Sequence, residues 1–201
     1  MTTRQYILFT IPALIWGSTW YVIKFQLGVV DPLLSVAYRF ILAGIILLLF
    51  VLISGKKMKF SVKEHALMLL LGLSLFGINY WFVYKAETVL TSGLVAVIFS
   101  LIIFFNIFFN AVLLKGKIKK EVVFAAILGV SGTALLFKNE FSSFSLNPED
   151  YIVLLFCLGG LISASLGNIL SAYKQKKNIP VLQANAFGMF YGGISMFLLV
   201  L

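Results

Sequence analysis

The stretch FILAGIILLLFVLI, residues 40–53, is apolar without a break. A strand of a membrane barrel needs short segments that alternate apolar and polar residues, and this stretch has no such alternation. Extended back to Pro32, the run is long enough for a helix to cross the hydrocarbon core of a bilayer, which takes about 20 residues. The stretch therefore predicts a transmembrane helix over Pro32–Ile53.

Six further apolar runs predict additional spans. They are Tyr6–Phe25, Ala66–Tyr84, Leu90–Leu114, Val122–Phe137, Tyr151–Tyr173 and Val181–Leu201. The chain of 201 residues is 61% hydrophobic and 11% charged, and its mean hydropathy is +1.05. No soluble domain could hide that much apolar surface in one core. We expect an all-α, polytopic bundle of seven helices in a lipid bilayer, with the first run retained as a span rather than removed as a signal peptide.

Basic residues gather on alternate connectors. Twelve of the sixteen Lys and Arg residues lie on one predicted side: Arg4, Lys56, Lys57, Lys59, Lys63, Lys115, Lys117, Lys119, Lys120, Lys174, Lys176 and Lys177. The other connectors hold Lys24, Lys85 and Lys138 with Asp31, Glu87, Glu140, Glu149 and Asp150. By the positive-inside rule, the N-terminus is cytoplasmic in a multi-pass protein of the cell membrane. Because the lysines are split among short loops, the net charge of +9 does not indicate nucleic-acid binding.

A weak internal repeat divides the chain. The polar segment 138–150 reads as an external loop between residues 1–137, with five predicted spans, and 151–201, with two. At a constant offset, Ile179–Gly193 can be laid over Asp31–Gly44, which pairs two prolines and two glycines. A unit of five helices ends on the side of the membrane opposite to its start. Its second copy would therefore be inverted in the membrane, as in many alternating-access transporters. Since that copy would need three more spans, we expect the chain to be part of a ten-helix protein, with a shortened relative as the alternative.

Four segments resemble the EamA-type members of the drug/metabolite transporter superfamily. They are WGSTWYVIK (16–24), DPLLSVAYRFILAG (31–44), YKAETVLTSGLVAVIFSL (84–101) and GVSGTALLF (129–137). The resemblance implies two inverted five-helix repeats around a central cavity, both termini in the cytoplasm, and export or exchange of small metabolites, amino acids or drugs. This chain departs from the family at Ile102, where span four usually has a proline, and at Leu114–Ile118 (LKGKI), where a glutamate is usual.

Arg39 is the ionisable residue that lies well inside a predicted span. An arginine at a helix centre costs about 2.5–3.5 kcal/mol on insertion scales, so it calls for a function or a compensating contact. The alternative is that its side chain extends to the lipid headgroups. If it binds solute, it would attract an anionic group.

Span four carries a polar stripe of Ser92, Asn106 and Asn110, whose spacing places them on one helix face. The stripe either hydrogen-bonds neighbouring helices or lines a cavity.

Spans one and three offer aromatic and amide groups. Trp16 and Trp20 lie in span one, and Asn79, Trp81 and Tyr84 in span three. Hydrogen-bonding groups beside flat apolar faces suit an amphipathic or aromatic solute, but also an interfacial aromatic belt.

Small residues predict close helix contacts. They recur every fourth position at Ala184, Gly188 and Gly192 in span seven, and at Ala125 and Gly129 in span five.

The chain has no HExxH, GxSxG, phosphate-loop or cysteine-cluster motif, and no Asp or Glu inside a predicted span. We therefore expect no enzyme, catalytic residue, metal or cofactor, and no carboxylate proton relay. Because Cys157 is the single cysteine, the chain cannot form an internal disulfide.

The leading hypothesis is a carrier of small organic metabolites or drugs, an exporter or exchanger, with a cavity lined by spans one, three, four and six. The alternative is a non-transporting membrane scaffold or a non-functional truncated carrier; the sequence specifies no oligomeric state.

Overall fold

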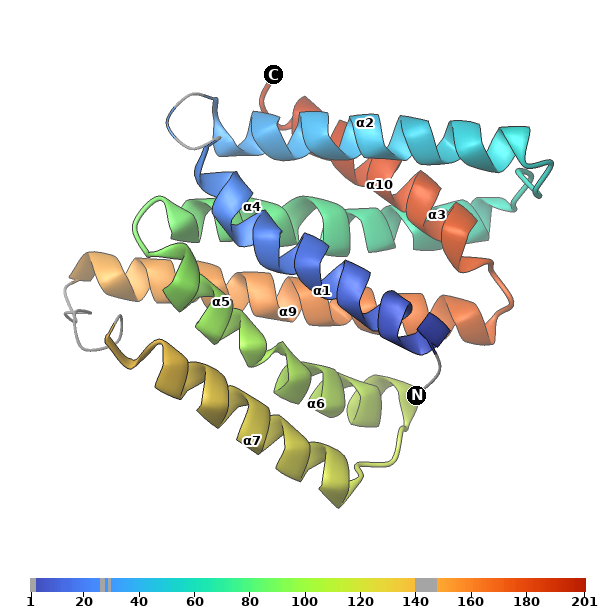
Figure 1. The fold of residues 1–201 in the computed structure, drawn as a ribbon. Helices are drawn as coiled ribbons and strands as arrows, with labels where there is room; N and C mark the ends of the chain where they lie inside the picture. Colours follow the sequence, from blue (N-terminus) through green and yellow to red (C-terminus); the bar gives the residue numbers. More distant parts are fainter. Residues whose placement is uncertain (1–2, 26–27, 29, 140–147) are drawn as a thin grey trace.

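The computed structural model describes residues 3–25, 28, 30–139 and 148–201, which form helices joined by short turns (Figure 1). In chain order the elements are α1 (Thr3–Lys24), α2 (Pro32–Ile53), α3 (Val62–Leu71), the π-helix η1 (Gly72–Ile78), α4 (Asn79–Glu87), α5 (Ser92–Ser100), α6 (Ile102–Leu114), α7 (Lys120–Leu136), α9 (Pro148–Lys176) and α10 (Val181–Leu198). Within these residues, six helical segments are long and apolar enough to cross a membrane. The predicted fifth span, α7, has 17 residues, or about 26 Å at the usual rise. The predicted all-α polytopic bundle is confirmed.

Local capping fixes where several helices begin. The Asp31 carboxylate accepts a hydrogen bond from the Leu33 amide at 2.7 Å, and Pro32 suits the first turn of α2. Ser61 and Glu64 form a capping box at the start of α3. Helix α9 starts at Pro148, ahead of the predicted Tyr151. Most of the predicted loop 138–150, from 140 to 147, lies outside the described residues.

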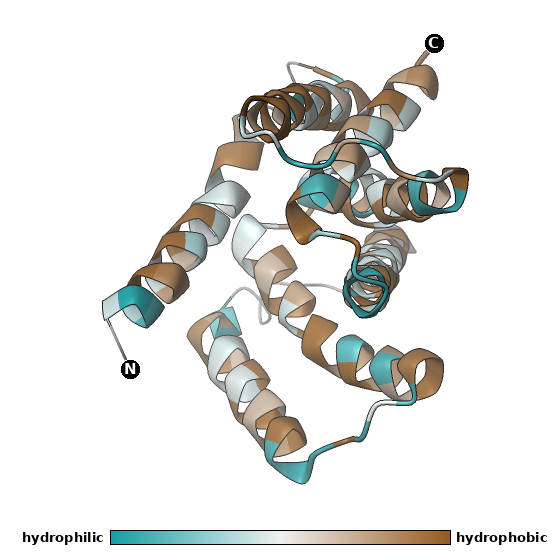
Figure 2. Ribbon diagram, turned by 90° about the vertical axis from the view of Figure 1, so that its right-hand side faces the viewer, coloured by the Kyte–Doolittle hydropathy of each residue, from teal (hydrophilic) through white to brown (hydrophobic). Residues whose placement is uncertain are grey.

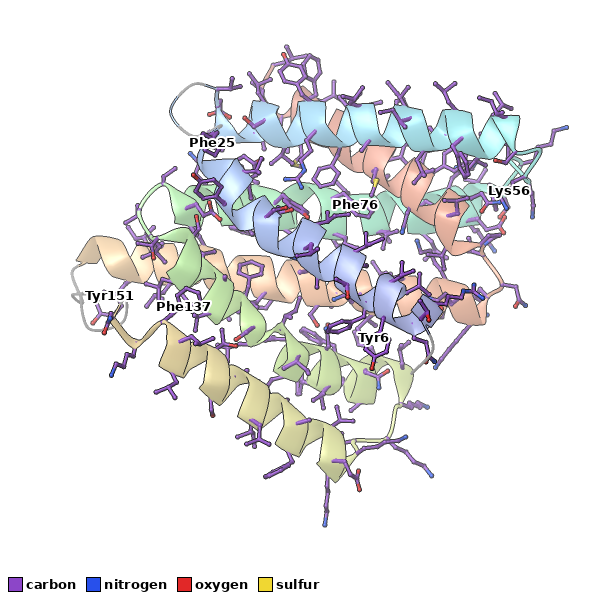
Figure 3. The ribbon with its side chains drawn as sticks, viewed as in Figure 1. Tyr6, Phe25, Lys56, Phe76, Phe137 and Tyr151 are labelled. Carbon is purple, nitrogen blue, oxygen red and sulfur yellow. The ribbon has the colours of Figure 1, made fainter. Side chains whose placement is uncertain are left out.

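The connectors alternate between the two ends of the bundle. The connectors after α2, α6 and α9 lie at the right-hand end of Figure 1. The turn between α4 and α5, the starts of α2 and α9 and the end of α7 lie at the left. Figure 3 labels Lys56 at the first end and Phe25, Phe137 and Tyr151 at the other. Hydrophilic residues gather at the helix ends and connectors (Figure 2). The lysine-rich connectors therefore share one end, as one membrane slab requires; its assignment to the cytoplasm stays a prediction.

Helices α9 and α10 hold the bundle together. Helix α10 packs against α2 and η1, and α9 packs against α4, η1 and α6. The backbones of α10 and η1 touch, because a Cβ atom added at Gly192 would lie 2.5 Å from the Gly72 carbonyl oxygen, and one added at Gly72 would overlap Gly188. The predicted close contact of the small residues of span seven is confirmed.

Helices α1 and α7 lie at the edges. Among the described side chains of α1, Ile23 alone is buried, and α1 contacts the rest mainly through α5. Helix α7 contacts α5 and α6. The predicted close contact at Gly129 is wrong, because a Cβ added there would meet nothing within 4 Å. Edge helices have few neighbours, so their small residues need not mark a contact.

Spans three and four contain irregularities that the sequence did not predict. Span three passes through η1 between α3 and α4. Span four breaks at Leu101, whose amide bonds the Ile98 carbonyl at 3.1 Å, while the Ser100 hydroxyl donates to Val97 at 2.6 Å. Such a local side-chain bond competes with the helix ladder. The break therefore forms beside Ile102 without a proline.

Asn106 joins α6 to α9. Its Oδ1 atom accepts hydrogen bonds from the Ser165 hydroxyl at 2.8 Å and from the Asn168 amide at 3.3 Å. At Asn106, the polar stripe of span four therefore hydrogen-bonds a neighbouring helix, which is one of the two predicted roles of the stripe.

Replacing Gly192 by leucine should disrupt the bundle. The new side chain would overlap the main chain of η1, which cannot move without displacing α10, so we expect a loss of about 3 kcal/mol or more. The measurement is the thermal midpoint in detergent by fluorescence size-exclusion chromatography. Gly132→Leu is the matched control, because a Cβ there meets nothing within 4 Å. An equal loss of stability in the two variants would contradict the close contact between α10 and η1 at Gly192.

Asn106→Leu should weaken the α6–α9 link, because it leaves Ser165 and Asn168 without their acceptor. A double-mutant cycle with Ser165→Ala should give a coupling free energy of about 0.6–1.7 kcal/mol, the range of interhelical hydrogen bonds in membranes. Additive effects on the thermal midpoint would show that the hydrogen bond does not form.

Candidate solute-binding site

A small cavity lies between α1, α4 and α5. We call it the Asn79 cavity; its volume is about 30 Å³, and its lining is Trp16, Thr19, Ile23, Asn79, Tyr80, Val83 and Phe99. Most of these side chains are aromatic or aliphatic, with an amide and two hydroxyls among them. This mixture is typical of sites for small organic molecules.

Asn79, which lines the cavity, has an unused hydrogen-bond acceptor. The side chain is 8% exposed, and its Nδ2 group donates to the Leu75 carbonyl at 3.5 Å. Because a carbonyl can only accept, this contact fixes the amide orientation. Oδ1 is then buried, with no hydrogen-bond partner in the described part of the chain. A buried polar atom of this kind calls for an explanation, and a ligand that donates a hydrogen bond supplies one.

Arg39 lies beside the same site. It lines a groove of about 560 Å³, the Arg39 groove, with Phe25, Val30, Ser35, Tyr38, Leu42, Ala43 and Ile46. Its guanidinium lies 5.0 Å from the centre of the Tyr80 ring and 5.6 Å from that of Phe40, and it hydrogen-bonds the Tyr84 side chain. These contacts supply the compensation that an intramembrane arginine needs. Tyr80 therefore contacts Arg39 and also lines the Asn79 cavity.

Glu87 is a neighbour that sequence reasoning missed. It was predicted to lie in a connector, but α4 extends to Glu87, whose side chain is 4% exposed. The Ser92 hydroxyl donates to its Oε2 at 3.3 Å, and Tyr84 lies three residues before it on α4. The expectation that no acid lies within a span is therefore wrong at the end of span three. The sequence did contain a signal for the position of Glu87. It lies three residues after Tyr84, and this spacing places the two side chains on one helix face.

The structure divides the predicted site residues into two groups. Trp16 and Asn79 line the cavity, and Arg39, Tyr84 and Ser92 belong to the adjoining polar cluster. The side chain of Trp20 lies outside the described part. The roles of these residues in binding stay predictions.

The second group lies elsewhere. Trp81 stacks near Phe156 of α9, with ring centres 6.3 Å apart. Asn106 bonds α9 as described, and the Asn110 carbonyl accepts the Gly116 amide at 3.0 Å, which closes the end of α6. Helix α9, the predicted sixth span, packs behind α4 and α6, while the cavity lining comes from spans one, three and four.

Taken together, the site offers an amide acceptor, a guanidinium, a carboxylate and several aromatic faces. Such groups can bind a solute that has both polar and apolar parts. Within the described residues, no three His, Cys, Asp or Glu side chains come together as metal ligands would.

Comparison with known proteins identifies the family of the chain. The chain is 32% identical over 183 residues to the uncharacterized inner membrane transporter YedA of Escherichia coli (strain K12), covering 90% of this chain and 56% of that protein. It is 26% identical over 188 residues to the uncharacterized transporter YoaV of Bacillus subtilis (strain 168), covering 91% of this chain and 62% of that protein. The chain thus spans little more than half the length of these curated relatives. No solved structure matches it with significance. The sequence model of the EamA-like transporter family matches residues 3–138, and the chain belongs to that family.

Proposed function

We propose that the protein acts as a carrier, an exporter or exchanger, that moves a small organic solute across the cytoplasmic membrane by alternating access. The observation that carries this proposal is the buried Oδ1 of Asn79, an unused acceptor in a cavity walled by aromatic side chains. The relatives YedA and YoaV are named transporters. Because the chain covers about half of YedA, the activity is proposed for the whole protein.

The packing of α2 against α10 supports an inverted repeat. These helices contain the two segments that match within the sequence, and they run in opposite directions across one another (Figure 1). A Cβ at Gly44 would meet the Phe190 backbone at 2.6 Å, and one at Gly193 would meet Ile41 at 2.6 Å. Each helix therefore offers a glycine to the other, as expected where two related halves meet about a shared axis.

The proposed mechanism follows from the size of the Asn79 cavity. A volume of about 30 Å³ holds roughly one water molecule, so a solute enters only if a wall moves. Helix α1 is the wall with the fewest contacts, mainly to α5. When α1 swings away, the solute places its apolar body between Trp16, Tyr80 and Phe99 and donates a hydrogen bond to Asn79. An anionic group, where present, binds Arg39.

The test is solute counterflow in proteoliposomes that contain the purified protein. Vesicles are loaded with a defined mixture of amino acids, nucleosides and organic acids, and mass spectrometry follows exchange. We expect Asn79→Leu to slow exchange of the transported solute about tenfold, the equivalent of one lost hydrogen bond, while the thermal midpoint stays equal or rises. Arg39→Gln should slow only solutes with an anionic group.

Thr133→Val is the matched control, because its hydroxyl bonds Gly129 within the exposed helix α7. Exchange at the wild-type rate in Asn79→Leu would remove Asn79 from the site. If no solute exchanges in the wild type, the protein is instead a membrane scaffold or a non-functional carrier.

A further inference from the structure

A second cavity lies at the lysine-rich end of the bundle, away from the Asn79 cavity. It has a volume of about 360 Å³ between the start of α3 and the end of α9, and we call it the basic cleft. Its lining is Lys63, Glu64, Leu67, Tyr173, Lys177 and Ile179. None of these residues takes part in the solute-binding site.

The basic cleft has more positive charge than the chain neutralises. Lys63 and Lys177 line it, and Lys177 lies 5.8 Å from the centre of the Tyr173 ring. The one acidic lining residue, Glu64, already accepts the Ser61 amide at 2.6 Å in the capping box of α3. Glu64 keeps its negative charge in this contact, so the two lysines and Glu64 leave one net positive charge at the cleft for an external anion.

Lys174 makes the charge imbalance sharper. It lies on α9 between Tyr173 and Lys177, and its carbonyl accepts the amides of Lys177 and Ile179 at 3.0 and 3.1 Å. The side chain is 1% exposed, and its Nζ atom has no hydrogen-bond partner within the described residues. An ammonium group removed from water without a partner is unfavourable. Lys174 does not itself line the cleft, but its neighbours Tyr173 and Lys177 do, so an anion bound there would bring a negative charge close to it.

The position of the basic cleft indicates which anion is at hand. Helix α3 begins at Val62 and α9 ends at Lys176, so the lining residues lie at the ends of spans, at the depth of the lipid headgroups. Leu67 and Ile179 give the cleft apolar walls, and Tyr173 is a residue type enriched at this interface. Basic pockets between membrane helices bind the headgroups of anionic lipids.

We propose that the basic cleft binds the phosphodiester headgroup of an anionic phospholipid. The phosphate contacts Lys63 and Lys177 and offsets the charge of Lys174, while the glycerol and upper acyl chains lie against Leu67 and Ile179. A phosphate-bearing solute presents the same chemistry, so the experiment separates the two sources. The proposal is independent of the solute carried at Asn79.

The first measurement is native mass spectrometry of the full chain released from nanodiscs of phosphatidylcholine with a minor fraction of phosphatidylglycerol. We expect preferential retention of phosphatidylglycerol, reduced at least fivefold in Lys63→Gln/Lys177→Gln. The matched control is Lys117→Gln/Lys119→Gln, which removes the same charge from the connector after α6. Equal reduction in the control, or no preference over phosphatidylcholine, would overturn the proposal.

The second measurement is the thermal midpoint in phosphatidylcholine alone and with phosphatidylglycerol, inorganic phosphate or glycerol 3-phosphate. Phosphatidylglycerol should raise the midpoint of the wild type, and the two soluble phosphates should not. Lys174→Met should match or exceed the wild type in phosphatidylcholine and lose most of the rise from phosphatidylglycerol. Stabilisation by a soluble phosphate equal to that by the lipid would identify a solute site instead, and a full rise in Lys174→Met would exclude Lys174 from the interaction.

Discussion

The hydrocarbon core of a bilayer contains no water that could hydrogen-bond a backbone amide or carbonyl group, and most of this structure depends on that constraint. The apolar runs form helices because a helix satisfies these groups within its own segment. Caps such as Asp31 and Ser61 satisfy the groups left at helix starts, near the membrane surface. The lysine-rich connectors lie together at one end because charged groups stay with water and headgroups.

The same constraint explains which polar side chains lie inside the bundle. Asn106 accepts hydrogen bonds from α9, and Arg39 lies over Tyr80 and bonds Tyr84. Among the described residues, Oδ1 of Asn79, within span three, and Nζ of Lys174, at the lysine-rich end, are buried without a hydrogen-bond partner. One is an acceptor on a residue that lines an aromatic cavity, and the other is a cation three residues before Lys177, which lines the basic cleft. This difference in chemistry and depth is why we propose two sites, one for a solute and one for a lipid headgroup.

The spans could be predicted from the sequence because each depends on local hydropathy. The bounds of α2 match the prediction at both ends, and the glycines of α10 showed their contact through spacing alone. The π-helix η1 and the burial of Lys174 could not be predicted, because each depends on how separate helices pack. The break at Leu101 forms through local hydrogen bonds, and no proline marks it in the sequence. For the site, composition identified Arg39 and Asn79 but gave no reason to exclude Trp81 or Asn110. The structure separates them by their neighbours, because Trp81 lies beside Phe156 and Asn110 accepts the Gly116 amide.

The central claim is that a single membrane slab orients the chain, with the lysine-rich connectors together on its cytoplasmic face. Single-cysteine labelling in intact cells tests it most directly, in a Cys157→Ser background with Lys56→Cys, Lys117→Cys or Val30→Cys. Our account predicts that a membrane-impermeant maleimide labels position 30 from outside, and positions 56 and 117 only after the membrane is opened. Labelling of positions 56 and 117 from opposite faces would contradict it.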